Sequence, residues 1–139
     1  LSDYYSIAHL QLTVAKDFEQ VQEEVYQLLL GCRETDYSAI LKDVDGAKIA
    51  AWWDRAVDII PANGGKGIGI QKVLEYYHLD KSEALAFGDG NNDIEMLLSV
   101  GTGVAMGNAS PQLKEVADEI CKDVAEDGIY DYCLTHGLI

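Results

Sequence analysis

The sequence predicts an α/β protein in two parts, and three observations support this. After residue 61, short apolar runs alternate with segments of helical periodicity, an order typical of parallel sheets with helices on both faces. Over residues 1–60 the pattern is instead a strand, a helix and several short extended runs, which indicates a small α+β unit. The stretch 61–65 (PANGG) punctuates the chain and marks the expected boundary.

In the first part, aromatic and branched residues predict a strand over residues 4–14. Asp17, followed by Gln20, fits the start of a helix. Its apolar face is expected at Phe18, Val21, Val25, Leu28 and Leu29, and Gly31 would end it. Three strands are then predicted over residues 37–41, 47–53 and 56–60, with turns at 45–46 and 54–55.

The second part opens with a predicted helix over residues 66–77. A buried strand at 84–87, a helix start at 94–98 and a second strand at 104–106 follow. Ser110 and Pro111 are typical of a helix start. The buried side of that helix is expected at Leu113, Val116, Ala117 and Ile120. A last strand at 121–125 and a terminal helix after a turn at 126–128 complete the prediction.

The charge, hydropathy and cysteine content of the chain argue against several classes of function. The net charge of −14 argues against a nucleic-acid partner, because proteins that bind phosphate backbones carry clustered Lys and Arg. No apolar run approaches the roughly 20 residues that a membrane span needs, and no signal peptide is visible. Cys32, Cys121 and Cys133 are odd in number and lack metal-like spacing, which favours a reduced, cytoplasmic setting.

The loop 88–93 (GDGNND) follows the predicted strand 84–87 directly. In open α/β sheets ligands bind beyond the carboxyl ends of strands, so Asp89 and Asp93 are expected at such a site. Mg²⁺ prefers carboxylate, water and phosphate oxygens, and the loop suits it. Helix capping by Asn92 and Glu95 also fits this pattern and is compatible with ligand binding. A calcium loop is excluded, since Ile94 stands where that motif requires glycine.

The segment 88–96 (GDGNNDIEM) resembles the fourth motif, GDGxNDxxM, of the haloacid-dehalogenase-like phosphatases, in particular the Cof-type subfamily. The segments 64–67 (GGKG) and 103–109 (GVAMGNA) resemble other parts of that family in the right order. This resemblance implies a Mg²⁺ ligand at Asp89 and a phosphate contact at Asn92. It also implies that Asp93 supports the metal site, through water or hydrogen bonds. It identifies residues 61–139 as the C-terminal portion of a Rossmann-like core and 1–60 as part of an α/β cap.

Lys66 stands at the start of a predicted helix, directly after two glycines. Free backbone N–H groups and the positive end of the helix dipole attract phosphate there, and the ammonium adds a full charge. A solvated lysine is the plainer interpretation of position alone, whereas the resemblance implies a phosphate-binding lysine. A P-loop is excluded, because Gly67 stands where the Walker pattern needs Ser or Thr.

The family's reaction needs an aspartate nucleophile and an acid/base aspartate in a DxDGT motif. The segment 43–47 (DVDGA) is rejected as that motif, because alanine replaces the threonine, Lys42 interrupts the strand and the segment lies in the cap-like part. The chain begins at Leu1 rather than at a methionine, so we expect an N-terminal portion to be missing.

The resemblance therefore implies the C-terminal part of a Mg²⁺-dependent phosphatase. Such an enzyme hydrolyses phosphate monoesters of small metabolites, expected to be sugar phosphates, through an aspartyl-phosphate. The 139-residue chain alone is expected to be inactive. Two alternatives stay open, a non-catalytic module that binds a phosphorylated ligand or a partner, and a phosphomutase. Surface exposed by the missing part predicts a homodimer or aggregation.

Overall fold

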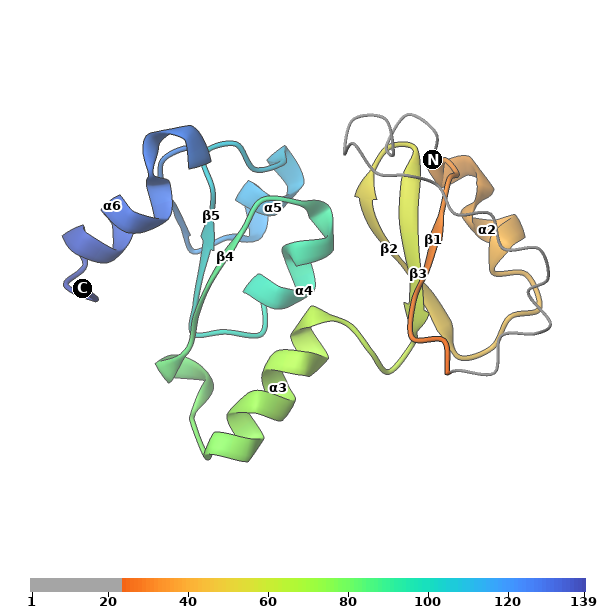
Figure 1. Ribbon diagram of the computed structural model, residues 1–139, viewed down its shortest axis with the longest axis horizontal. Helices are drawn as coiled ribbons and strands as arrows, with labels where there is room; N and C mark the ends of the chain where they lie inside the picture. Colours follow the sequence, from red (N-terminus) through yellow and green to blue (C-terminus); the bar gives the residue numbers. More distant parts are fainter. Residues whose placement is uncertain (1–23) are drawn as a thin grey trace. The chain divides into compact units, whose positions relative to one another are not determined.

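The structure, a computed structural model, describes residues 24–139. The strand expected over residues 4–14 and the helix start at Asp17 lie outside this range. The chain divides between Pro61 and Ala62 into two compact units, and Figure 1 shows the elements of each.

In the first unit, residues 24–61 contain an antiparallel sheet of three strands, β1 (Leu28–Leu30), β2 (Ala47–Trp53) and β3 (Ala56–Pro61), in the order β1-β3-β2. Strands β2 and β3 form a hairpin around the two residues 54–55, as the turn signal predicts. A short 3-10 turn, η2 (Glu34–Asp36), and one helical turn, α2 (Tyr37–Ile40), connect β1 to β2. The strands predicted at 47–53 and 56–60 are confirmed.

Two predictions in this unit are wrong. Leu28 and Leu29 lie in β1 and not on a helix, because the backbone of this leucine run pairs with β3, where Leu29 faces Asp58. Residues 37–40 form helix α2 and not a strand. Helix α2 continues from η2, and the Asp36 carboxylate closes that turn by accepting the backbone N–H of Arg33 at 2.9 Å. Pairing with a distant strand determines the conformation of the first segment, and a local side-chain hydrogen bond helps determine that of the second. The spacing of hydrophobic residues in the sequence reveals neither interaction.

The second unit contains a parallel sheet of three strands, β4 (Leu85–Gly88), β5 (Thr102–Ala105) and β6 (Glu119–Ile120), in that order. The helices are α3 (Lys66–Tyr77), α4 (Ile94–Leu97), α5 (Pro111–Val116) and α6 (Gly128–Thr135). Three 3-10 turns connect them, η3 (Lys81–Glu83), η4 (Asn91–Asp93) and η5 (Val124–Glu126). This parallel α/β arrangement confirms the predicted fold class.

Helices cover both faces of the parallel sheet. Successive strand residues point to opposite faces, and Phe87 and Gly88 show which helix covers each. The Phe87 ring meets Tyr132 of α6 edge-on, with centroids 5.3 Å apart, whereas a Cβ at Gly88 would lie 2.9 Å from the Leu97 side chain of α4. In Figure 1, α4 and α6 accordingly flank β4 and β5 from opposite sides.

The buried core of the second unit lies between β5 and helices α4 and α5, with Leu97, Ala105 and Leu113 among its members. Helix α5 starts as predicted, because the Ser110 hydroxyl accepts the N–H of Leu113 at 3.2 Å and Pro111 occupies the first helical position. No helix within residues 24–139 is long and apolar enough to cross a bilayer.

The prediction for the end of α5 is wrong. The helix ends at Val116, and Ile120 is an exposed residue of β6. The cause is Asp118, whose backbone N–H donates to the Gly103 carbonyl at 2.9 Å while its carboxylate accepts the Gly103 N–H at 2.8 Å. These two bonds bring the chain beside β5, so the last strand starts two residues earlier than predicted.

Candidate active site

The loop after β4 is closed by Asp93. Its carboxylate accepts the backbone N–H groups of Asp89 at 3.0 Å and Gly90 at 3.1 Å, which fixes the turn between the strand and α4. Asp93 is also the N-cap residue of α4, a position that sequence analysis gave to Asn92. Asn92 instead folds back over the loop, since a Cβ at Gly90 would lie 2.6 Å from its amide oxygen.

Lys66 reaches this loop from the first residue of α3. Its ammonium forms an ion pair with Asp93, whose side chain is 5% exposed against 49% for the lysine. The adjacent Gly67 permits this contact, because a Cβ there would lie 2.8 Å from the backbone oxygen of Glu95 in α4. Close approach of the two helices therefore places the lysine over the carboxylate.

The environment of Asp93 keeps it charged. Burial acts to raise the pKa of its carboxyl, but the hydrogen bonds from Lys66 and from the backbone N–H groups of Asp89 and Gly90 outweigh burial. The pKa of Asp93 therefore lies below its ordinary value.

Lys66, Asp89 and Asp93 line one hollow of about 400 Å³. The predicted phosphate contact, Asn92, is not among its lining residues. The remaining walls are mostly apolar and come from β4, α4 and the segments after β5 and β6: Phe87, Gly88, Met96, Met106, Asn108, Val124 and Ile129. A cationic group and an acidic turn thus share one concave surface at the carboxyl end of β4.

Asp89 differs from Asp93 in what surrounds it. Its side chain is exposed, and among the described residues none donates a hydrogen bond to its carboxylate. Residues 24–139 contain no cluster of three or more His, Cys, Asp or Glu groups that could hold a metal by themselves. One available carboxylate fits Mg²⁺ nevertheless, because this ion commonly keeps its waters and binds one or two carboxylates plus substrate phosphate.

The segment 43–47, rejected as a nucleophile motif, lies in a turn before β2. Asp43 has φ 59°, a left-handed conformation, and Gly46 has φ 79°. Neither aspartate of this segment follows a parallel strand, which agrees with the rejection.

Sequence analysis missed Asn108 and Asn91. Asn108 lines the hollow, and the Asn91 amide oxygen accepts a hydrogen bond from the Ser110 hydroxyl, which ties the loop after β4 to the start of α5. The available signal was the position of Asn108, three residues after the end of β5 in the parallel sheet.

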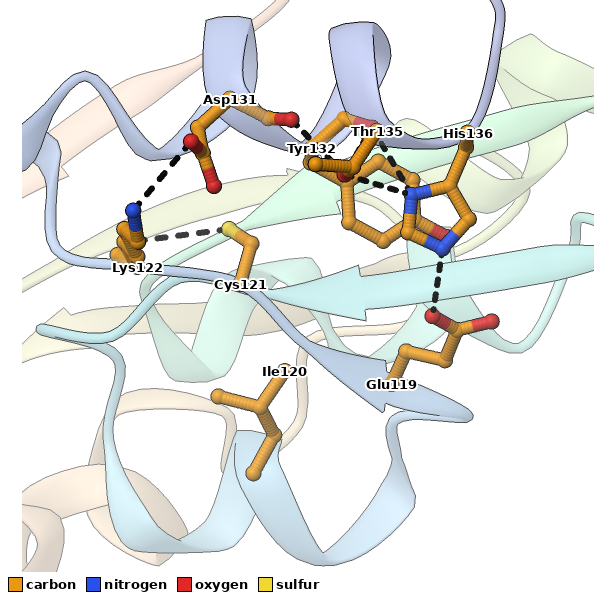
Figure 2. A pocket seen from close by; sticks show the side chains of 8 residues that line it. All are labelled: Glu119, Ile120, Cys121, Lys122, Asp131, Tyr132, Thr135 and His136. Carbon is orange, nitrogen blue, oxygen red and sulfur yellow. Dashed lines mark hydrogen bonds and ion pairs between the residues drawn. The ribbon is translucent and has the colours of Figure 1, made fainter.

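A second hollow, of about 180 Å³, lies where α6 meets β6 (Figure 2). Two polar contacts bridge it, His136 Nε2 to the Glu119 carboxylate at 3.4 Å and an ion pair of Lys122 with Asp131 at 3.2 Å. The His136 ring stacks on Tyr132 with centroids 3.8 Å apart. Burial, and secondarily a hydrogen bond to Glu119, raises the pKa of Tyr132. These contacts attach the C-terminal helix to the edge strand.

Comparison with known proteins agrees with this fold. The sequence profile of the haloacid dehalogenase-like hydrolases matches residues 2–133, and the chain belongs to this family. Within it, the chain falls in the Cof-type, subclass IIB group.

Two curated relatives come from Bacillus subtilis. YkrA is 45% identical over 107 residues, 77% of this chain and 41% of YkrA. The 5-amino-6-(5-phospho-D-ribitylamino)uracil phosphatase YitU is 35% identical over 137 residues, 93% of this chain and 50% of YitU. The chain thus spans half or less of the length of these two relatives.

Two solved structures show the same fold. The subclass IIB sugar phosphatase BT4131 superposes with a TM-score of 0.87 at 29% identity, covering 99% of this chain and 54% of BT4131. BT1666 from Bacteroides thetaiotaomicron, a phosphatase of the same superfamily, superposes with a TM-score of 0.89 at 31% identity, covering 99% of this chain and 52% of BT1666.

Proposed function

We propose that this chain supplies the phosphate-binding and metal-binding part of a Mg²⁺-dependent phosphatase that acts on phosphate monoesters of small metabolites. The carrying observation is the shared hollow, in which the buried Asp93 carboxylate binds both the Lys66 ammonium and the backbone N–H of Asp89. The sugar phosphatase BT4131 and the phosphorylated uracil derivative in the name of YitU support a small phosphorylated substrate, with sugar phosphates preferred.

The proposed roles follow from the environment of each residue. The Lys66 ammonium neutralises phosphoryl oxygens, and Asp93 holds both that ammonium and the loop after β4 in place. The Asp89 carboxylate, which accepts no hydrogen bond from a described residue, is the Mg²⁺ ligand. Asn92 contacts the phosphate after rotating away from Gly90. When bound, Mg²⁺ neutralises charge between the carboxylate and the phosphoryl oxygens.

A covalent aspartyl-phosphate requires a nucleophilic carboxylate facing the phosphorus. Within the described residues, the carboxylates that line the hollow are those of Asp89 and Asp93, and Asp93 is committed to Lys66 and the loop. We therefore place the nucleophile motif outside this chain, in the missing part of a longer phosphatase. The coding sequence upstream of Leu1 tests this directly, with a stretch encoding DxDGT as the expected result.

Titration of the isotope-labelled chain tests the site itself. Mg²⁺ is expected to shift the backbone amide signals of Asp89 and Gly90, and inorganic phosphate added with Mg²⁺ is expected to shift those of Lys66 and Asn92. The 139 residues alone are expected to leave an aryl phosphate intact. Amide signals that do not shift with either ion, or hydrolysis of the aryl phosphate by the chain alone, would overturn this assignment of the site.

Two other functions make different predictions. A start codon at Leu1 together with phosphate binding would support a non-catalytic module. A phosphomutase shares the core, and the full-length protein would then release an isomerised sugar phosphate instead of free phosphate.

Location and self-association complete the proposal. Three free thiols support a cytoplasmic setting. The exposed apolar side chains of α3, Val73, Tyr76 and Tyr77, support a homodimer, and sedimentation showing only monomer would contradict it.

A further inference from the structure

Asn108 presents a side-chain amide whose orientation is fixed by the fold. It follows β5 by three residues and lines the same hollow as Lys66 and Asp89. Its oxygen, Oδ1, accepts the backbone N–H of Val124 at 3.1 Å. Because a backbone N–H can only donate, the oxygen must face Val124, and the Nδ2 group with its two hydrogens must lie on the other side of the amide.

The backbone that carries Asn108 is held at several points. The N–H of Gly107 donates to the Lys122 carbonyl at 3.1 Å, and the Lys114 ammonium donates to the Gly107 carbonyl at 2.6 Å. The packing is also tight, since a Cβ at Gly107 would lie 2.5 Å from the backbone nitrogen of Asp123. Asn108 is therefore a preorganised group whose position does not depend on a ligand.

The Nδ2 group is available. Among the described residues no hydrogen bond uses it, and the Asn108 side chain is exposed. Two free N–H donors on the hollow that the Lys66 cation also lines match the acceptor oxygens of a phosphate group.

We propose that the Nδ2 group of Asn108 donates a hydrogen bond to a phosphate oxygen of the bound substrate. The proposal rests on the proposed function, since it adds a substrate contact to that site. Asn108 thereby does two things with its two amide atoms, because Oδ1 fastens the segment before η5 while Nδ2 binds the ligand.

Substitution separates these two actions. In Asn108→Asp the side chain still accepts the Val124 N–H but has no donor for phosphate, whereas Asn108→Ala loses both. Asn91→Asp is the matched control for charge. This variant also replaces an amide with a carboxylate, at a residue whose side-chain oxygen accepts a hydrogen bond from Ser110. Asn91, however, does not line the hollow. Salt near 0.15 M limits long-range repulsion, because the Debye length is then about 8 Å.

The measurement is titration of the 139-residue chain with inorganic phosphate in the presence of Mg²⁺, followed by NMR. We expect the Nδ2 signals of Asn108 to shift, and Asn108→Asp to weaken phosphate binding about 10- to 100-fold, the loss of one hydrogen bond between charged and neutral partners. Its melting temperature should stay near that of the unsubstituted chain. Asn108→Ala should weaken binding and also lower the melting temperature, and Asn91→Asp should bind phosphate nearly normally.

Two outcomes overturn the proposal in distinguishable ways. If Lys66 and Asp89 respond to the ions while the Nδ2 signals stay still and Asn108→Asp binds like Asn91→Asp, the Asn108 contact is wrong and the proposed function stands. If none of the three residues responds, both are wrong.

Discussion

Replacing Asp93 with asparagine should destabilise the second unit and leave its fold intact. The carboxylate accepts three hydrogen bonds, one from the Lys66 ammonium and two from the backbone N–H groups of Asp89 and Gly90. An asparagine oxygen can keep the backbone bonds in weaker form, but its NH₂ group then faces the ammonium, so the bond to Lys66 is lost. A hydrogen bond to a charged group contributes about 1.5–3 kcal/mol. With the weakened backbone bonds, we expect a loss of about 2–4 kcal/mol at pH 7.

The effect should depend on pH in a defined direction. Because the pKa of Asp93 in the folded chain lies below its ordinary value of 3.8, the charged carboxylate adds stability above that value. This stability is lost as the pH falls through the lower pKa of the folded chain. The difference between the unsubstituted chain and Asp93→Asn should therefore be constant from neutral pH down to about pH 5 and shrink below pH 4.

The assay is urea denaturation at several pH values, with Asp89→Asn as the matched control. Asp89 follows the same strand, but its carboxylate is exposed and accepts no hydrogen bond from a described residue, so this change should alter stability by less than about 0.5 kcal/mol. It should instead abolish the response to Mg²⁺. Equal unfolding midpoints for the two variants, or a gap that persists in acid, would refute this account of Asp93.

Two further predictions concern packing. Gly67→Ala should lower the free energy of unfolding by about 1–3 kcal/mol and weaken phosphate binding, because the added Cβ would press on the Glu95 carbonyl of α4. Gly69→Ala lies in the same helix but faces open space, so it should raise the free energy of unfolding by about 1 kcal/mol. Thermal denaturation compares the two variants. Tyr132→Ala should cost about 3–5 kcal/mol and remove hydrogen-exchange protection from α6, because the ring is buried against Phe87. Tyr130→Ala, at a residue 60% exposed, is its control, and equal loss of protection in both would contradict the role of Tyr132.

The second unit could be predicted well from sequence because its signals are local and agree with one another. The apolar run before Gly88, the glycine pair before Lys66 and the Ser110-Pro111 helix start each specify one element through nearby residues, although Leu85 is exposed and the run is less buried than predicted. Lys66 and Asp93, 27 residues apart, form the ion pair, as expected if both serve one site.

The rest could not be predicted because it depends on partners distant in sequence. Leu28–Leu30 is a strand only because β3 offers a free edge, and Glu119 and Ile120 join the sheet only because Asp118 bonds to Gly103. The division of labour between Asp89 and Asp93 has the same origin. Their spacing in the sequence identifies both as acidic loop residues. Only the structure shows that Asp93 is the one buried in an ion pair with Lys66.

The turn after β4 also bears on the thermodynamics of binding. Since the Asp93 carboxylate already binds the backbone N–H groups of Asp89 and Gly90, the backbone of this turn is ordered before an anion or cation arrives. The turn then loses little backbone entropy when a ligand binds, so even a small ligand that makes few contacts can be bound there.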